Sequence, residues 1–91
     1  MKYEVKFTSQ FKKDFKRIKR RNLDLIKFFQ VIKMLAEGTR LPEEYRDHPL
    51  MGDYKGAREC HIKADWLLIY KVFDDTVVLE LTRTGSHSDL F

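Results

Sequence analysis

The strongest constraint on the fold is the run of eight residues from 66 to 73, WLLIYKVF, which is apolar on both faces of an extended chain. Apolar residues at both odd and even positions indicate a strand buried on both sides, and therefore a central strand of a sheet. Asp74 and Asp75 follow this run and predict a turn. Residues 76–83 are rich in β-branched side chains and predict another strand.

The N-terminal part of the chain predicts a strand followed by a helix. Apolar and charged residues alternate along residues 3–7, and this period of two indicates a strand with one buried face. After this strand, large apolar residues recur every three or four positions as far as Ile18, which is the pattern of an amphipathic helix. We expect this helix at about residues 9–20, with Thr8 or Ser9 as its N-cap.

A second helix is predicted directly after the first, so that the two form a helical hairpin. Asn22 can cap its start, and Gly38 is suited to end it. The aromatic and aliphatic stripes of both helices are most simply interpreted as core. In the second helix this stripe consists of Leu25, Phe28, Phe29, Ile32 and Leu35.

The remaining segments complete an α+β domain. Residues 38–53 lack periodicity and contain several Gly and Pro, so they predict a long loop with at most a short helical turn at 43–46. Residues 57–62 predict a strand that a short turn joins to the central one, and Ser86 can cap a last helical turn. The order is β-α-α-β-β-β, which indicates one α+β domain over residues 1–91.

The composition indicates a small globular domain in a reducing compartment. An apolar fraction of 43% is too high for a disordered tail. Cys60 is the single cysteine, so we expect no internal disulfide, a cytoplasmic location, and a small core residue rather than a nucleophile. No apolar run approaches the roughly 20 residues that span a bilayer, and the first residues lack the apolar core of a signal peptide, so no membrane partner is expected.

Charge is distributed unevenly along the chain. Residues 1–40 hold twelve Lys or Arg against four Asp or Glu, whereas residues 41–91 hold six against ten, although the net charge is only +4. The densest basic block lies at residues 12–21. A solvated helix face fits this block, and so does a surface that binds phosphates or an acidic protein. For the second interpretation the candidate contacts are Lys12, Lys13, Lys16 and Arg17.

Three histidines beyond residue 40 suggest the candidate chemistry. Their spacing matches neither HExxH nor a Cys/His cluster, so no metal site is predicted, and no GxSxG sequence marks a nucleophilic serine. Cleavage of RNA by acid–base catalysis fits better, because imidazoles transfer protons near neutral pH and the 2′-hydroxyl is the nucleophile. Arg83 is suited to binding the phosphate, and Trp66 or Phe91 to stacking on a base. The histidines are His48, His61 and His87.

Three motifs in order resemble YafQ-type toxins of the RelE superfamily. They read DHPLxGxxKGxRxxH at residues 47–61, DWxLIYK at 65–71 and RTGSHxxLF at 83–91, where the family typically has Thr at the position of Ser86. The resemblance covers the whole chain. It implies a RelE-like fold, in which a helical hairpin packs on a small, mainly antiparallel sheet.

The resemblance also implies a function. Proteins of this family are toxins of type II toxin–antitoxin systems that cleave mRNA in the ribosomal A site and so inhibit translation. The implied partners are the ribosome, mRNA and a cognate antitoxin similar to DinJ with an acidic segment, and operator DNA is bound only by the toxin–antitoxin complex. No metal or cofactor is required.

The resemblance assigns functional positions that agree with those suggested by the residues themselves. His87 or His48 would be the base and His61 or His87 the acid, while Asp65 would orient an imidazole or raise its pKa. The family's catalytic positions fall on His48, His61, Asp65 and His87, with Arg83 on the phosphate and Trp66 and Phe91 lining the site.

Other classes of function remain open at this point. A ParE-like toxin of the same superfamily would bind DNA gyrase without catalysis, although such toxins lack the histidine set. A non-catalytic RNA-binding module would use only the basic hairpin. A free ribonuclease would cleave RNA without the ribosome.

Overall fold

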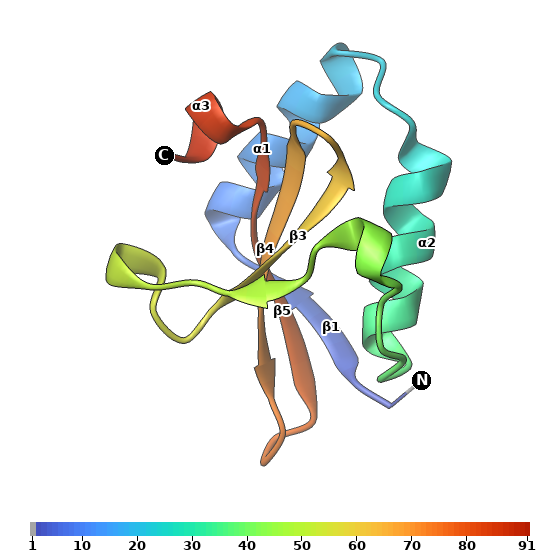
Figure 1. Cartoon of the computed structure of the whole chain (residues 1–91), viewed down its shortest axis with the longest axis vertical. Helices are drawn as coiled ribbons and strands as arrows, with labels where there is room; N and C mark the ends of the chain where they lie inside the picture. The colour runs from blue at the N-terminus through green and yellow to red at the C-terminus, as the bar shows by residue number, and fades with distance from the viewer. Residues whose placement is uncertain (1) are drawn as a thin grey trace.

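The computed structural model describes residues 2–91, which form five strands around which three helices and two short 3₁₀ turns are arranged (Figure 1). The strands are β1 (Glu4–Phe7), β2 (His48–Pro49), β3 (Arg58–Lys63), β4 (Trp66–Phe73) and β5 (Val78–Gly85). The helices are α1 (Ser9–Arg20), α2 (Leu25–Ala36) and α3 (His87–Leu90), and the 3₁₀ turns are η1 (Glu43–Tyr45) and η2 (Gly52–Tyr54).

The strands form one sheet in the order β1-β5-β4-β3-β2. β1 runs parallel to β5, and every other neighbouring pair is antiparallel. The predictions of a mainly antiparallel sheet with residues 66–73 at its centre are therefore confirmed. β2 was not predicted, because two residues are too few to show an alternating pattern.

The helix boundaries follow from local capping. α1 occupies residues 9–20 as predicted, and the Thr8 hydroxyl accepts a hydrogen bond from the backbone N–H of Phe11 at 2.9 Å. The predicted cap of α2 is wrong: Asp24 accepts from the backbone N–H of Lys27, whereas Asn22 lies in the connecting turn with a φ of 55°. Gly38 follows α2 with a φ of 75°, a conformation that glycine adopts without strain.

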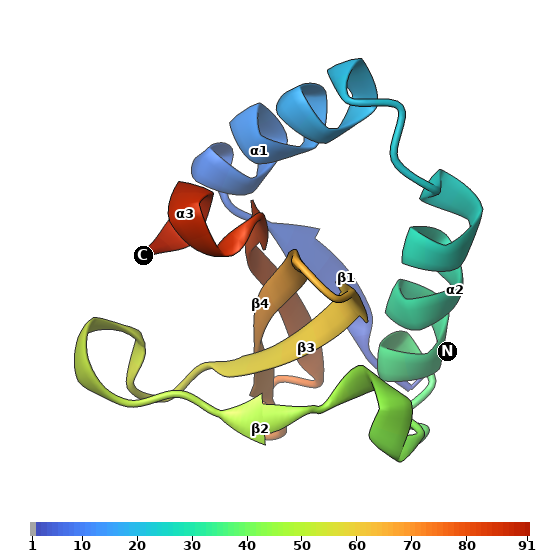
Figure 2. The same ribbon diagram turned by 45° about the horizontal axis from the view of Figure 1, so that its top comes forward.

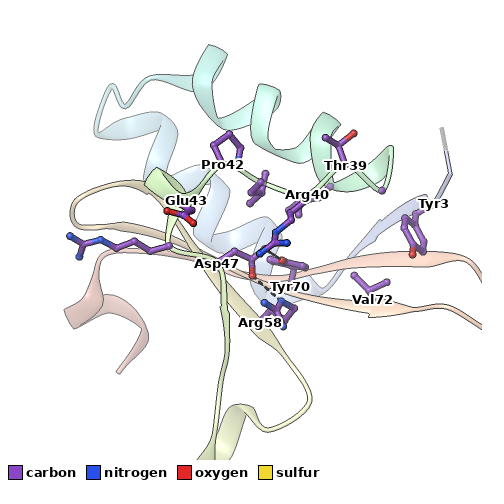
Figure 3. Close-up of a pocket in the computed structure, with 13 residues that line it drawn as sticks. Tyr3, Thr39, Arg40, Pro42, Glu43, Asp47, Arg58, Tyr70 and Val72 are labelled. Atoms are coloured by element: carbon purple, nitrogen blue, oxygen red, sulfur yellow. Dashed lines mark hydrogen bonds and ion pairs between the residues drawn. The ribbon is translucent and has the colours of Figure 1, made fainter.

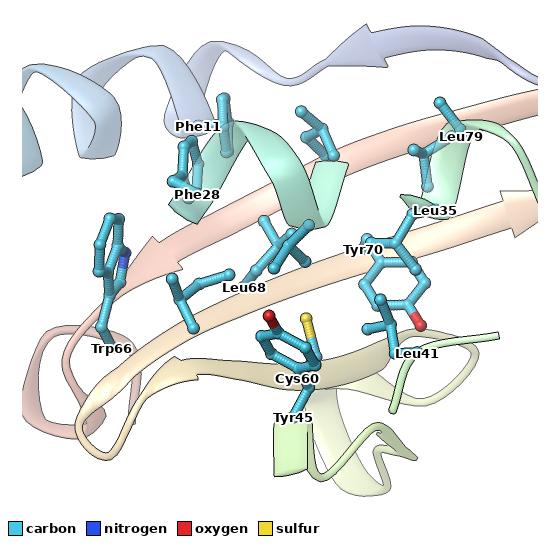
Figure 4. Close-up of a cluster of buried hydrophobic side chains, with 14 of the residues drawn as sticks. Phe11, Phe28, Leu35, Leu41, Tyr45, Cys60, Trp66, Leu68, Tyr70 and Leu79 are labelled. Carbon is cyan, nitrogen blue, oxygen red and sulfur yellow. The ribbon is translucent and has the colours of Figure 1, made fainter. Parts of the chain in front are cut away.

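The core lies between the sheet and the two long helices. Figure 2 shows α1 and α2 curving around one side of the sheet, and Figure 4 shows the aromatic side chains that fill the space between them. Phe28 stacks on Trp66 with ring centroids 5.2 Å apart, and Cys60 is fully buried in the same cluster, as predicted. Burial raises the pKa of the Cys60 thiol, which keeps it protonated and unreactive.

The other face of the sheet is covered more thinly. Leu67 and Ile69 of β4 point to this face, where Leu90 of α3 packs against them together with the partly buried Leu50 and Tyr54. The alternation of β4 side chains therefore serves two cores, which is why residues 66–70 at the start of this strand are all hydrophobic and buried. Short α3 leaves part of this second face open, and the candidate site is built there.

Candidate active site

Pairing across four strands places several of the predicted site residues on the second face of the sheet. His48 of β2 pairs with Glu59 of β3, Glu59 pairs with Ile69 of β4, and Ile69 pairs with Arg83 of β5. Neighbouring strands are about 4.8 Å apart, so Glu59 and Arg83 are separated by roughly 10 Å with Ile69 between them. The site therefore has two sides, one on β2 and β3 and the other on β5 and α3.

The first side consists of two imidazoles and a carboxylate. Glu59 is only 4% exposed, and its Oε2 lies 3.2 Å from His48 Nε2 and 3.6 Å from His61 Nε2. The opposite ring nitrogens face backbone carbonyls: His48 Nδ1 is 2.7 Å from the oxygen of Arg46, and His61 Nδ1 is 3.3 Å from that of Ala64. The structure thus brings His48 and His61 together through a residue that the sequence analysis did not single out.

A hydrogen-bond network on the opposite face holds β2 in place. Asp47 accepts a hydrogen bond from Arg58 Nε at 2.8 Å and another from the Tyr70 hydroxyl, as Figure 3 shows. Burial and the Asp47 carboxylate both raise the pKa of Tyr70, so this phenol remains a hydrogen-bond donor. The network borders a pocket of about 360 Å³. Its two hydrogen bonds hold Asp47, the residue that precedes His48 in the chain.

On the second side, Arg83 is fixed by a buried carboxylate of α1. Arg83 donates from Nε to Asp14 at 2.8 Å and from Nη2 at 3.1 Å, and the backbone N–H of Thr84 also donates to Asp14. The hydrogen bonds to Asp14 raise the pKa of Arg83 above its ordinary value, so the guanidinium remains charged. Asp14 was not predicted as a site residue, because it lies inside the basic block of the sequence.

His87 is the first residue of α3, four residues after Arg83, and its side chain is exposed. Its ring lies 4.9 Å from the exposed ring of Phe91, measured between centroids, and its backbone N–H donates to Asp65 at 2.9 Å. We expected Asp65 to orient an imidazole; in the structure its carboxylate accepts the hydrogen bond from this backbone N–H and so positions the start of α3. Ser86 caps α3 as predicted, in a capping box with Asp89.

Asp89 also ties α3 to α1. It accepts a hydrogen bond from Arg21 Nη1 at 2.7 Å, and Arg17 Nη1 is 3.6 Å away. The hydrogen bond from Arg21, supported by the backbone N–H of Ser86, holds the pKa of Asp89 well below its usual range. The helix that carries His87 is therefore anchored at both ends of its single turn.

Trp66 does not line an open site, contrary to expectation. Its side chain is 3% exposed because Phe28 stacks on the ring, and its Nε1 donates to the Thr84 hydroxyl at 3.0 Å. The ring is therefore part of the core, and its contact with the site is indirect, through the residue next to Arg83. Phe91, in contrast, is exposed beside His87, where a base could stack on it.

The basic residues of α1 divide into two groups. Lys12, Lys13 and Lys16 are exposed, whereas Arg17 is half-buried and lies within ion-pair distance of Asp14 and Asp89. Arg17 therefore helps to hold the architecture of the site, while the lysines are free to contact a partner.

Glu59 is the main site residue missed by the sequence analysis. It lies two positions before His61 in the predicted strand 57–62, so the period of two already places both side chains on one face. The signal that could have identified Glu59 is an acidic residue two positions from a histidine within a strand that is predicted to be buried. Within residues 2–91, no group of three or more His, Cys, Asp or Glu has the arrangement of a metal site. The same residues include no helix that is long and apolar enough to cross a membrane.

Comparison with known proteins identifies the family. Residues 3–91 match the family described as "Bacterial toxin of type II toxin-antitoxin system, YafQ". The chain belongs to the YafQ family. The resemblance predicted from three motifs is thus confirmed, and this YafQ-family chain is a toxin of a type II toxin–antitoxin system. It is 39% identical to the mRNA interferase toxin YafQ of Escherichia coli K12 over 89 residues, which cover 97% of this chain and 95% of that protein.

Solved structures confirm the α+β fold of this YafQ-family toxin. The E. coli DinJ–YafQ complex contains a chain that matches it with a TM-score of 0.89 at 38% identity, covering 98% of both chains. A metal-bound toxin from Helicobacter pylori matches with a TM-score of 0.91 at 39% identity, covering 98% of this chain and 99% of that one.

Proposed function

We propose that this YafQ-family toxin is an mRNA interferase, an endoribonuclease that cleaves mRNA in the ribosomal A site and so stops translation in the cytoplasm. The name of the E. coli relative supports the class of activity. The observation that carries the mechanism is the two-sided arrangement of the site, with His48, Glu59 and His61 on one side and Arg83 and His87 on the other.

This arrangement suits cleavage by the RNA's own 2′-hydroxyl. One imidazole removes the 2′ proton, the 2′ oxygen attacks phosphorus, and the bond to the 5′ oxygen breaks as another imidazole protonates it. Arg83 remains charged through Asp14 and can stabilise the negative charge that develops on the phosphate. The exposed ring of Phe91 beside His87 can stack on a neighbouring base. No step requires a metal.

The products test this mechanism directly. Programmed ribosomes incubated with the toxin should yield mRNA fragments that end in a 2′,3′-cyclic phosphate and begin with a 5′-hydroxyl. Toxin stripped with a chelator and repurified should cleave equally fast. Equal cleavage of naked RNA would instead identify a free ribonuclease, and absence of cleavage would favour a non-catalytic RNA-binding module.

The gyrase-binding alternative predicts a different cellular phenotype. Expression of the toxin should first stop protein synthesis, because its target is translating mRNA. An early block of DNA replication with normal translation would instead support a ParE-like function.

We further propose that the cognate antitoxin, a DinJ-like protein, covers an apolar groove beside α1 and α2. The groove has a volume of about 490 Å³ and a floor of phenylalanines, and Lys12, Lys16 and Lys19 lie along its rim. Such a surface is complementary to an amphipathic segment that carries acidic residues. The toxin–antitoxin complex, rather than the toxin alone, would then bind operator DNA.

Phe29→Asp should weaken antitoxin binding by at least about 2 kcal/mol, or roughly thirtyfold in Kd, without affecting mRNA cleavage. Phe29 lines the groove and is 52% exposed, so the change places a charge where an apolar contact is expected. Titration calorimetry with the purified antitoxin measures the effect. Ile26→Asp is the matched control, because Ile26 is exposed on the same helix outside the groove. Equal effects of both variants would contradict the assignment.

Replacing all three lysines Lys12, Lys13 and Lys16 by Gln should weaken association with the ribosome. The slope of log association constant against log salt concentration should become shallower by up to about three. All three side chains are exposed, and Arg17 is left intact because of its ion pairs. Sedimentation with ribosomes at several salt concentrations measures both quantities. The control variant replaces three exposed lysines outside α1 by Gln, namely Lys2, Lys6 and Lys33. Unchanged association would mean that the basic face of α1 is only solvated.

A further inference from the structure

Tyr54 belongs to the segment between β2 and β3, which projects from the sheet on the side of the C-terminus (Figure 2). Its partly buried ring packs against the small core of Leu67, Ile69 and Leu90. Its hydroxyl donates a hydrogen bond to the backbone carbonyl of Leu90 at 3.3 Å. Tyr54 therefore attaches this segment to α3, the helix that carries His87.

The ring of Tyr54 also contacts Phe91, which the proposed function uses as a surface for a base. The two rings meet edge to face, with centroids 5.5 Å apart and an angle of 73° between their planes. Phe91 also contacts the imidazole of His87, at 4.9 Å between centroids. Because Phe91 is 57% exposed, these two neighbours, and not burial, determine how its ring lies.

Tyr54 is a neighbour of Arg83 as well. Asp14 is the main group that raises the pKa of Arg83, through hydrogen bonds, and Tyr54 adds to this effect. Tyr54 thus lies near both the guanidinium that is suited to a phosphate and the ring that is suited to a base. In RNA the sugar joins the phosphate to the base, so the groups that bind them must lie at a matching separation. A side chain that is next to both groups can fix this separation.

A ring that is held in place makes a better stacking surface than a free one. Stacking of a base on an aromatic side chain strengthens binding about five- to 150-fold. A free exposed ring would lose its rotation when the base binds, and this loss of entropy would weaken binding. The edge-to-face contact with Tyr54 restrains the Phe91 ring before the RNA binds, while more than half of Phe91 stays accessible.

We propose that Tyr54 is a positioning residue for mRNA, which holds the Phe91 ring where a base stacks on it while Arg83 binds the adjacent phosphate. This assignment rests on the proposed function and adds the residue that aligns the two contacts. Tyr54 takes no part in proton transfer. Loss of its ring should therefore weaken binding of the substrate and leave the rate constant of the bound complex almost unchanged.

A thermodynamic cycle between the protein and the mRNA tests this role. Programmed ribosomes carry an mRNA in which one nucleotide of the A-site codon lacks its base, at each codon position in turn. Single-turnover cleavage at increasing toxin concentration gives the rate constant at saturation and the toxin concentration at half-maximal rate. For the wild type, deletion of the stacked base should raise the half-maximal concentration about tenfold. For Tyr54→Leu, the same deletion should raise it less than about threefold, because the stacking contact is already lost.

Variants of matched size separate the ring from its hydroxyl. On the complete mRNA, Tyr54→Leu should raise the half-maximal concentration about tenfold and change the rate constant at saturation less than about threefold. Tyr54→Phe keeps the ring and loses only the hydrogen bond to Leu90, so it should stay within about threefold of the wild type on both mRNAs. Phe73→Leu is the control, because Phe73 is an exposed aromatic residue at the opposite end of β4 and should not affect cleavage.

Two results would overturn the assignment. Base deletion that affects the wild type and Tyr54→Leu by the same factor would show that Tyr54 has only a structural role. A wild type that tolerates base deletion at every codon position would show that no base stacks beside Tyr54. Tyr54→Met, whose flexible side chain fills irregular space, takes the place of Tyr54→Leu if that variant folds poorly. Failure of the wild type to cleave the complete mRNA on ribosomes would instead overturn the proposed function.

Discussion

His87→Ala is expected to lower the rate of mRNA cleavage by roughly 10²–10⁴-fold, while the protein remains folded and binds its antitoxin. The imidazole stands at the exposed start of α3 beside Phe91, and no hydrogen bond of the fold uses its ring atoms within residues 2–91. Its removal therefore deletes a proton-transfer group without opening a cavity. The measurement is single-turnover cleavage on programmed ribosomes, with fragment ends mapped by primer extension.

The control for this variant lies on the same helical turn. Ser88→Ala removes an exposed hydroxyl that lies 3.1 Å from the hydroxyl of Ser86, so it should leave cleavage almost unchanged. Circular dichroism and antitoxin binding establish that both variants are folded. A folded His87→Ala variant with full activity would refute the catalytic assignment.

The sequence predicted those parts of the fold whose signals are local. α1 and β4 have the predicted bounds because capping residues and apolar periodicity lie within a single segment. β2 escaped prediction, because its two residues form a strand only through pairing with β3, which is ten residues further along the chain. A strand that is defined by pairing with another strand, and not by its own alternating pattern, cannot be recognised from a short stretch of sequence.

The candidate site shows the same division. The histidines and Arg83 could be identified because motif spacing marks them, but the relations among them depend on pairing across the sheet. Glu59 joins His48 to His61 only once β2, β3 and their register are known. Trp66 shows the converse, since an aromatic residue in a site motif proved to be core.

The uneven charge of the chain acquires a more specific meaning in the structure. The basic block on α1 is not uniformly exposed, because Arg17 and Arg21 are drawn into contacts with Asp89 of α3. Conversely, the acidic Asp14 of α1 forms an ion pair with the basic Arg83 of β5. Two reciprocal contacts thus link the helix that carries the basic surface to the segment that carries the candidate catalytic groups Arg83 and His87.

Asp14→Ala is expected to destabilise the protein by roughly 3–5 kcal/mol, because it leaves the guanidinium of Arg83 without its partner in a largely buried setting. Asp14 is fully buried and accepts from two nitrogens of Arg83 and from the backbone N–H of Thr84. For a domain of this size, about 4–8 °C of Tm is lost per kcal/mol. Denaturant unfolding and thermal melts, with and without the antitoxin, measure the loss.

Cleavage should decrease in the same variant under conditions in which it is still folded, since Arg83 is no longer directed toward the phosphate. Gln10→Ala is the control: it removes a single peripheral hydrogen bond to Asp14, of 3.2 Å, and should cost no more than about 1 kcal/mol. The double variant Asp14→Ala/Arg83→Ala should lose less unfolding free energy than the two single variants lose in sum, because no unpaired charge remains. It should nevertheless stay inactive, because Arg83 is missing. Recovery of stability without recovery of cleavage would separate the structural role of Arg83 from its role in cleavage. Wild-type stability of Asp14→Ala would instead show that the buried ion pair contributes little to the stability of the fold.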